Sequence, residues 1–330
     1  MDAQSLARLS TAYAEARILH SAVDLGIFET LANNPATEAE IREKTGLHAR
    51  FARDFLGALV TLGLLERTGR TYRNSAVADE FLTPSGPVFL GGRIRTASTR
   101  HYHTWGHLTD ALRDGEPKAG GGQAFEELGR DPAKARNFLV HMDANNGQVA
   151  PQLVEHVDWS TYRSFVDVGG ARGNVAAQLV KALPHLTGGV FELPYVEPFF
   201  DEFVASLGLT DRLTFHAGSF FDAPLPATDV VVFGHVLHDW TAEKRQELLE
   251  KAFSAISPAG AVVIYDQMLD DEAPDLRSLI GSLNVGLITG GSEYTVGECR
   301  EQVEKAGFRY GYDVKLPRGN DTVVVGVKEA

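Results

Sequence analysis

Hydrophobic residues in the first third of the chain recur at helical spacing. Apolar positions three to four residues apart across residues 5–32 predict a long helical segment. A short helix is predicted to end at Gly46, and a second helix to cover residues 49–62. The pattern of residues 64–72 then indicates a β-hairpin. Two helices around a glycine turn, followed by a hairpin, predict a winged helix-turn-helix.

The pattern differs in the second half of the chain. From residue 163 to 330, short apolar runs alternate with helical stretches, which is typical of an α/β fold with a doubly wound sheet. The strands are predicted at residues 164–168, 188–191, 213–216, 229–233, 260–265, 309–315 and 322–328. We expect the last two to pair antiparallel. Between the two halves, helices are predicted at residues 124–128 and 133–156, after a glycine-rich loop at residues 118–122.

Composition and charge are those of an ordinary soluble globular protein. Of the 330 residues, 44% are apolar and 23% are charged, which suffices for two domains with sizeable cores. The sequence has no apolar run of membrane-spanning length and no secretory signal, so we expect a cytoplasmic protein. Cys299 is the single cysteine. It excludes an intrachain disulfide and a multi-cysteine metal site, and its helical neighbours indicate a buried thiol.

The winged helix raises the alternative of DNA binding by a ligand-sensing transcription factor. His48, Arg50, Arg53, Arg67 and Arg70 could contact phosphate groups. The net charge of −13 opposes this hypothesis, because nucleic-acid-binding surfaces are basic. The first hundred residues are nearly neutral, and the second predicted helix is rich in Phe and Leu. We therefore favour a structural winged helix that mediates dimerisation, without a nucleic-acid partner.

A glycine-rich turn follows the first predicted strand of the α/β half. Residues 165–173 lead from an apolar strand through the turn toward a helix, and Glu192 follows the next apolar run. This is the layout of a nucleoside-binding site in a parallel sheet. The turn lacks the glycine spacing of a dinucleotide fingerprint and the Gly-Lys-Ser/Thr end of a phosphate-binding loop. What remains is acid-x-Gly-x-x-x-Gly, formed by Asp167, Gly169 and Gly173. The alternative is a turn that merely tightens a strand-helix corner.

Several segments at the predicted strand ends resemble one family. The turn after Asp167 is similar to the first motif of S-adenosylmethionine-dependent methyltransferases, with Ala171 in place of its middle glycine. Residues 236–240, Val-Leu-His-Asp-Trp, resemble the signature of the winged-helix small-molecule O-methyltransferases of plant phenolics and actinobacterial polyketides. Residues 290–295 are similar to the family's Gly-Gly-x-Glu-Arg-Thr stretch, with Tyr294 replacing Arg. The resemblance covers nearly the whole chain.

The resemblance implies a fold, a cofactor and partners. It implies a winged-helix dimerisation domain at residues 1–100 and linker helices at residues 101–160 that roof the substrate pocket. A Rossmann-like catalytic domain is expected at residues 161–330. S-adenosylmethionine would be the cofactor, an aromatic small molecule the acceptor, and a homodimer would form through the N-terminal domain. Secondary metabolism, such as antibiotic biosynthesis, would be the setting.

The resemblance also implies roles for single residues. His238 would be the general base, bracketed by the acidic pair Asp266 and Glu293. The cofactor would be held by Asp167, Gly169, Gly173, Glu192, Ser219, Phe220 and Gly234. Glu192 begins a Glu-Leu-Pro that resembles the family's Asp-Leu-Pro, and it would bind the ribose. Two further positions depart from the family pattern: Ser219 replaces Asp, with Asp222 as a substitute, and Gly234 replaces the Lys of many plant members.

The acceptor pocket is expected to be lined by residues of the linker helices and the later loops. The candidates are Trp105, Phe138, Met142, Asn146, Asp239, Asn284 and Ile288. Met142 and Trp105 suit an aromatic acceptor. Ordinary packing between domains is the alternative for these positions.

Elementary chemistry supports His238 as the base. The methyl group of a sulfonium is already activated, so the enzyme must align an oxygen and remove its proton. A nearby carboxylate favours the imidazolium and raises the basicity of the histidine. The alternatives are that His238 caps a helix, or that it binds a metal with His235 and Asp239; we expect no metal. We therefore predict an O-methyltransferase. An N- or C-methyltransferase, or a methyltransferase-like protein with another reaction, is the alternative.

Overall fold

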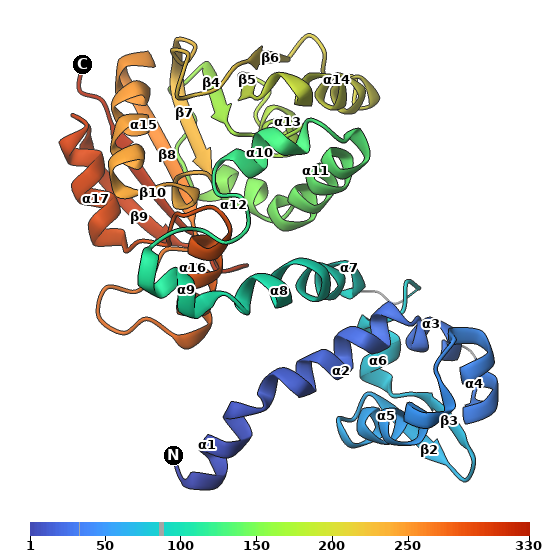
Figure 1. Ribbon diagram of the computed structural model, residues 1–330. Helices are drawn as coiled ribbons and strands as arrows, with labels where there is room; N and C mark the ends of the chain where they lie inside the picture. Colours follow the sequence, from blue (N-terminus) through green and yellow to red (C-terminus); the bar gives the residue numbers. More distant parts are fainter. Residues whose placement is uncertain (33, 86–88) are drawn as a thin grey trace. The chain divides into compact units, whose positions relative to one another are not determined.

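The computed structural model describes residues 1–32, 34–85 and 89–330 (Figure 1). The chain divides into two compact units, Met1–His107 and Leu108–Ala330. Within the described ranges, no helix is both long enough and apolar enough to cross a membrane.

The N-terminal unit combines helices with a small antiparallel sheet. Its described helices are α1 (Ala3–Ser10), α2 (Ala12–Asp24), α3 (Ile27–Leu31), α4 (Glu38–Thr45), α5 (Ala49–Thr61), α6 (Ala76–Phe81), α7 (Gly91–Thr96), the π-helix η1 (Ala97–His101) and α8 (Tyr102–Trp105). Its described strands pair in the order β1-β3-β2, and they are β1 (Ala36–Thr37), β2 (Leu65–Thr68) and β3 (Thr71–Asn74). Helices α4 and α5 with the β2–β3 hairpin form the winged helix-turn-helix that the sequence predicts.

Local sequence signals account for the limits of these helices. The hydroxyl of Thr37 accepts from the backbone N–H of Glu40, whose carboxylate accepts in return from the N–H of Thr37, so a capping box starts α4. Gly46 ends α4 with a φ of +73°. The single helical segment expected at residues 5–32 is divided into α1, α2 and α3. One break lies at Thr11 and the other at Gly26, which has a φ of +68°.

Residues 108–330 contain a sheet of seven strands in the order β6-β5-β4-β7-β8-β10-β9. The strands are β4 (Ser164–Val168), β5 (Thr187–Glu192), β6 (Leu213–Ala217), β7 (Thr228–Gly234), β8 (Ile256–Asp266), β9 (Arg309–Lys315) and β10 (Thr322–Val327). Adjacent strands from β6 to β8 are parallel, and β10 runs antiparallel to both β8 and β9. The doubly wound α/β fold and the antiparallel last pair are confirmed.

Helices cover both faces of this sheet (Figure 1). The helices of this unit are α9 (Leu108–Asp114), α10 (Gln123–Leu128), α11 (Pro132–Asn146), α12 (Val149–His156), α13 (Asn174–Ala182), the short η2 (Pro194–Val196), α14 (Glu197–Ser206), the short η3 (Leu237–Asp239), α15 (Ala242–Ala255), α16 (Leu276–Ile288) and α17 (Val296–Lys305). Val230 and Val232 of β7 share a core with α12, α13 and α14, whereas Val231 and Phe233 share the opposite core with α15 and α17. Burial on both faces explains why the central strands are apolar throughout.

Three expectations differ from the observed elements. The helix expected at residues 133–156 is two helices, α11 and α12, separated at Gly147. Helices α7, η1, α8 and α9 lie before the glycine-rich loop at residues 118–122, where the apolar pattern predicted no helix and the resemblance implied linker helices only from residue 101. Strand β8 begins at Ile256 rather than at residue 260. The Ser-Pro-Ala-Gly segment that resembles a turn continues the strand, with Ala259 at a φ of +63°. In the first and third cases the apolar pattern identified the element, while backbone geometry decided its limits.

The end of β7 depends on the absence of a side chain at Gly234. A Cβ atom at this position would lie 1.8 Å from Cζ of Tyr265, which is buried at 1% exposure. Gly234→Ala should therefore lower the free energy of unfolding by about 1–3 kcal/mol, because the neighbouring ring has no room to move. Urea denaturation followed by circular dichroism measures this change.

Gly281→Ala is the matched control. Gly281 lies inside α16, where the nearest atom to an added Cβ is 3.8 Å away. Alanine there should be neutral or stabilise the protein by up to about 1 kcal/mol, since it favours the helix. Equal urea midpoints for the two variants would contradict the close packing described at Gly234.

Candidate active site

The glycine-rich turn connects β4 to α13 at the carboxyl edge of the sheet. Gly169 has a φ of +72°, and a Cβ there would lie 2.6 Å from Cγ2 of Val236, so the loop after β7 packs directly on the turn. Gly173 has a φ of +85° and begins α13. Ala171 also lies in the left-handed region, at a φ of +51°, where a methyl-bearing residue is strained. The backbone therefore keeps the conformation of a glycine turn although one glycine is replaced.

Two carboxylates lie beside this turn, the buried Asp167 and the half-buried Glu192. Glu192, at the end of β5, accepts hydrogen bonds from the N–H of Leu193 (2.7 Å) and of Ala171 (3.2 Å). Asp167 is 2% exposed, and its Oδ2 has no hydrogen-bond partner in the described part of the chain. Burial raises the pKa of Asp167 to about 7, helped by the charge of Glu192, and burial likewise raises the pKa of Glu192 to about 7. An acceptor without a donor in a buried position suits a ligand that brings hydroxyl or amino groups.

Aromatic rings gather at the ends of β6 and β7. The ring centroids of Phe220 and Phe221 lie 5.8 and 4.6 Å from that of Trp240. The ammonium of Lys244 lies 4.9 Å from the Trp240 centroid, and Lys251 donates hydrogen bonds to the carbonyls of both phenylalanines. This cluster offers flat apolar surface of the kind that a purine ring contacts.

Ser219 and Gly234, which depart from the family's usual cofactor-binding residues, make other contacts in this structure. The Ser219 hydroxyl accepts from the N–H of Phe221 at 3.3 Å, so it stabilises its own turn. Asp222, considered as its substitute, is exposed to solvent. The position of Gly234 is filled by the ring of Tyr265, which gives this glycine a packing role.

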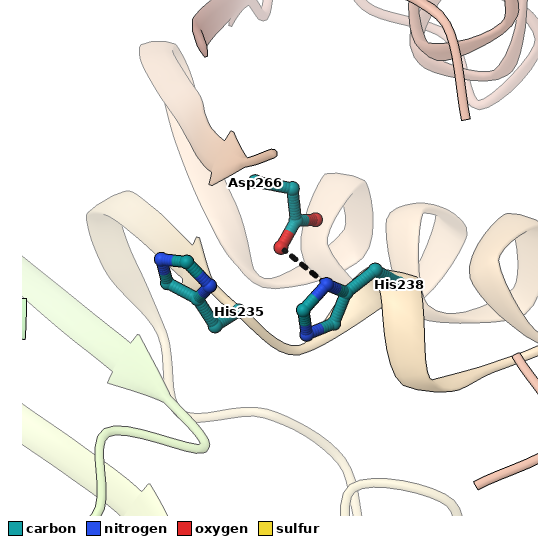
Figure 2. A group of neighbouring side chains, drawn as sticks. All are labelled: His235, His238 and Asp266. Atoms are coloured by element: carbon teal, nitrogen blue, oxygen red, sulfur yellow. Dashed lines mark ion pairs between the residues drawn. The ribbon is translucent and has the colours of Figure 1, made fainter. Parts of the chain in front are cut away.

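His238 lies on η3, the short helix that follows β7, and faces two carboxylates. Its Nδ1 is 2.9 Å from Oε1 of Glu293 and 3.8 Å from Oδ1 of Asp266. Figure 2 shows one oxygen of Asp266 directed toward the imidazole of His238, and the other turned away. Since the close contact with Glu293 calls for a proton on Nδ1, Nε2 is left as the acceptor in the neutral ring.

The glycine pair before Glu293 explains how this carboxylate reaches His238. A Cβ on Gly291 would lie 2.0 Å from the carbonyl oxygen of His238, so this loop contacts the backbone of η3 without an intervening side chain. The N–H of Ser292 donates to the same carbonyl at 2.9 Å. The Gly-Gly-x-Glu sequence therefore lets the loop after α16 pack against η3, which brings the carboxylate of Glu293 to the imidazole.

The electrostatics of this cluster favour a strongly basic histidine. Burial alone would lower the pKa of His238, but the charges of Asp266, Asp239 and Glu293 raise it well above its ordinary value. Burial raises the pKa of Asp266 to about 6, an effect that the positive charge of His238 opposes. Burial also raises the pKa of Asp239.

Two contacts in this cluster were not predicted from the sequence. His235 has a φ of +53°, and its Nε2 lies 3.3 Å from Oδ1 of Asp321, just before β10. The hydroxyl of Tyr294 donates to Oδ2 of Asp266 at 2.5 Å. The sequence marked His235 only as a candidate metal ligand, and Asp321 is distant from it along the chain. No signal in a single sequence links these pairs.

A metal ion was the alternative interpretation of the histidines. His235, His238 and Asp266, rather than Asp239, offer atoms within 4.8 Å of one another (Figure 2). Both imidazoles, however, already contact carboxylates, His235 through Asp321 and His238 through Glu293.

The candidate acceptor residues of the second unit lie mainly on two helices. On α11, Phe138 packs edge-on against Phe125, whose ring in turn contacts Trp240 of the aromatic cluster. Met142 is half-buried on the same helix, and Oδ1 of Asn146 is buried without a hydrogen-bond partner among the described residues. Half-buried positions on α16 are held by Asn284 and Ile288. Trp105 belongs to the N-terminal unit, where it is half-buried.

Comparison with known proteins identifies the family. The O-methyltransferase domain family matches residues 105–309, and the O-methyltransferase dimerisation domain matches residues 7–84. The chain belongs to the O-methyltransferase family. It uses S-adenosylmethionine as its cofactor, and the winged-helix unit is the family's dimerisation domain, which supports a homodimer.

Two relatives from Streptomyces align over almost the full length. The tetracenomycin polyketide synthesis 8-O-methyl transferase TcmO of Streptomyces glaucescens is 45% identical, covering 97% of this chain and 95% of the relative. The N,N-dimethyltransferase OxyT of Streptomyces rimosus is 43% identical, covering 99% and 96%. The solved structure of the mitomycin 7-O-methyltransferase MmcR has a TM-score of 0.87 at 28% identity, covering 99% of this chain and 97% of that one.

The carboxylates at the glycine turn lead to a prediction for cofactor binding. The pKa values of Asp167 and Glu192 are both raised to about 7, so each carboxylate gains a proton as the pH falls through this value. A protonated carboxyl is a weaker acceptor than a carboxylate. The affinity for S-adenosylhomocysteine should therefore fall as the pH is lowered from 8 to 6. Each carboxylate that gains a proton lowers the affinity by up to about tenfold per pH unit.

Isothermal titration calorimetry at a series of pH values measures this dependence. In Glu192→Gln the affinity should be lower and the pH dependence weaker, because one of the two titrating groups is gone. An affinity that stays constant or rises as the pH falls would refute the assignment of these carboxylates to the cofactor.

Proposed function

We propose that this enzyme methylates a hydroxyl group of an aromatic, polyketide-type small molecule, with His238 as the general base. The observation that supports it best is the hydrogen bond of 2.9 Å between Nδ1 of His238 and Oε1 of Glu293. This contact leaves Nε2 free to accept a proton at the carboxyl edge of the sheet, where ligands of such folds bind.

Burial at the glycine turn and the aromatic cluster supports the proposed cofactor contacts. Asp167 and Glu192 would accept hydrogen bonds from the cofactor's hydroxyl and amino groups, and Phe220 with Trp240 would contact the adenine. When bound, S-adenosylmethionine supplies a methyl group that the sulfonium has already activated. Because no further activation of the methyl group is needed, we propose a reaction without a metal ion.

The chain's own residues would handle the proton of the acceptor hydroxyl. A phenol has a pKa of about 10, and an ordinary histidine about 6.5, so removal of the proton by an isolated imidazole is uphill. The carboxylates of Glu293, Asp266 and Asp239 reduce this difference because they raise the pKa of His238. Glu293 would also fix the tautomer, and Asp266 would stabilise the imidazolium that forms.

Residues of α11 and α16 would line the acceptor site. Phe138 and Met142 offer apolar surface next to the aromatic cluster, and Oδ1 of Asn146 offers an unused acceptor for a second hydroxyl of the substrate. Asp143 of α11 accepts from Nε of Arg172 in the glycine turn at 2.6 Å. Helix α11 is thereby linked to the cofactor turn, so that acceptor and cofactor sites lie on connected elements.

The similarity to the N,N-dimethyltransferase OxyT supports N-methylation as a second candidate function. A neutral amine attacks with its lone pair and does not need to lose a proton before the transfer. A hydroxyl gains much more from a general base, because its oxygen becomes a good nucleophile as the proton leaves. The base with three neighbouring carboxylates therefore favours oxygen as the acceptor atom.

His238→Ala should lower the rate of methyl transfer by roughly 10²–10⁴-fold, the usual contribution of a general base, with cofactor affinity retained. Single-turnover assays with a hydroxylated polycyclic aromatic acceptor, read by mass spectrometry, measure the rate. His185→Ala is the control. His185 lies just before β5, at the edge of the sheet opposite to His238, where its ring contacts the carbonyl of Trp159. Undiminished transfer in His238→Ala would rule out the proposed base.

A pair of matched acceptors distinguishes the two candidate functions. A naphthol and the corresponding naphthylamine differ in the acceptor atom but share shape and size. We expect methylation of the naphthol to depend strongly on His238 and that of the amine to be slow in both proteins. Faster methylation of the amine, unaffected by His238→Ala, would favour N-methylation instead.

A further inference from the structure

Asp266 is the most deeply buried carboxylate of the cluster, and its two oxygens are used differently. Its side chain has no exposed surface. Oδ1 lies 3.8 Å from Nδ1 of His238 and has no hydrogen-bond partner among the residues that the structure describes. Oδ2 accepts from the hydroxyl of Tyr294 at 2.5 Å. Across the described residues, this is the single hydrogen bond to the carboxylate, so it determines how the group is oriented toward the imidazole (Figure 2).

Tyr294 is itself held firmly. Its side chain is 1% exposed, and its backbone carbonyl accepts from the N–H of Leu269 at 2.9 Å. The guanidinium of Arg245 lies 4.5 Å from the centre of the tyrosine ring and donates to the carbonyls of Trp240 and Ser292. Contacts on the backbone, the ring face and the hydroxyl therefore fix one position for the tyrosine.

The charges around Asp266 show why this contact matters. The titratable groups that face it or its imidazole partner are His235, His238, Asp239, Arg245, Tyr265, Glu293, Tyr294 and Cys299. Burial raises the pKa of Tyr294 well above its ordinary value, so the hydroxyl keeps its proton and remains a donor. The family stretch that resembles residues 290–295 carries Arg at this position. This chain has a neutral donor there instead, which orients Asp266 without cancelling its charge.

We propose that Tyr294 is a positioning residue for the reaction: its hydroxyl orients the buried Asp266 carboxylate toward His238 and preserves the negative charge that supports the base. Tyr294 contacts neither the acceptor nor the cofactor in this role. It acts through Asp266, which stabilises the imidazolium formed when His238 accepts a proton.

The direction of the effect follows from the hydrogen bond. A donor to a carboxylate favours its charged form, so loss of the Tyr294 hydroxyl raises the pKa of Asp266, which burial already raises to about 6. Asp266 is then partly protonated near neutral pH. With less negative charge beside it, His238 is a weaker base, and its pKa falls.

The test is the pH dependence of kcat/KM in Tyr294→Phe, and it rests on His238 being the base of the proposed function. The ascending limb of the profile, which reports the base of the free enzyme, should move to lower pH by about 0.5–1 unit. The plateau rate should fall by about three- to tenfold, because a weaker base assists proton removal less. Cofactor affinity should stay as in the unmodified enzyme.

Two further variants separate positioning from a general structural effect. Tyr310→Phe removes another tyrosine hydroxyl that donates to an aspartate, Asp313, on β9, and should leave the profile unchanged. Asp266→Asn should move the limb in the same direction as Tyr294→Phe. Adding Tyr294→Phe to Asp266→Asn should cause no further shift, since the tyrosine acts through the carboxylate.

Nuclear magnetic resonance titration of the imidazole of His238 provides a readout without turnover. The pKa of His238 should fall in Tyr294→Phe whether or not an acceptor is present. An unchanged or raised pKa, or additive shifts in the double variant, would overturn the inference. If instead His238→Ala retains full activity while the imidazole pKa still responds to Tyr294→Phe, the proposed base is wrong and the contact through Asp266 stands.

Discussion

The hydrogen bond between His238 and Glu293 is the interaction on which the arrangement of the active site depends. Its partners lie on different segments, η3 after β7 and the loop between α16 and α17. They meet because Gly291 lets the second loop contact the backbone of η3 directly. On its other side, η3 is held against the glycine turn by Val236 on Gly169. The same few residues of backbone therefore contact the glycine turn and carry His238, which connects the proposed cofactor site with the proposed base.

A buried carboxylate destabilises the fold unless partners replace its hydration, and this chain carries such groups at several positions. An ionised group in a poorly solvated site loses several kcal/mol of hydration unless partners replace the water. Asp266 has Tyr294 and the charge of His238, and Glu192 has two backbone N–H donors. Asp167 has an oxygen without a partner among the described residues, which is where a bound ligand would contribute most. Burial raises the pKa values of these groups to about 6 to 7, because the partners replace only part of the hydration that burial removes.

Much of this architecture could be predicted from the sequence, and the reasons why the rest could not are physical. Apolar periodicity located the strands because burial on both faces makes them apolar throughout, and spacing located the glycine turn. The resemblance to the methyltransferase family pointed to His238, Asp266 and Glu293, which the structure brings together. The pairs His235–Asp321 and Tyr294–Asp266 join distant segments, so no local pattern encodes them. The predicted ends of helices and strands were wrong where backbone geometry rather than composition decided them, as at Gly147 and at the start of β8.

The pKa of His238, the proposed base, also affects which kind of acceptor atom the site favours. A histidine whose pKa is raised well above its ordinary value keeps its proton to a higher pH than an ordinary imidazole, and it must lose that proton before it can act as a base. This requirement lowers the active fraction, but the stronger base then removes a phenolic proton more readily. The arrangement has a benefit only if proton removal limits the reaction, as it does for a hydroxyl acceptor. For a neutral amine, the same carboxylates would lower the fraction of unprotonated His238 without speeding the methyl transfer. The retention of Glu293 and Asp266 around His238 thus favours oxygen, although one near relative is an N,N-dimethyltransferase.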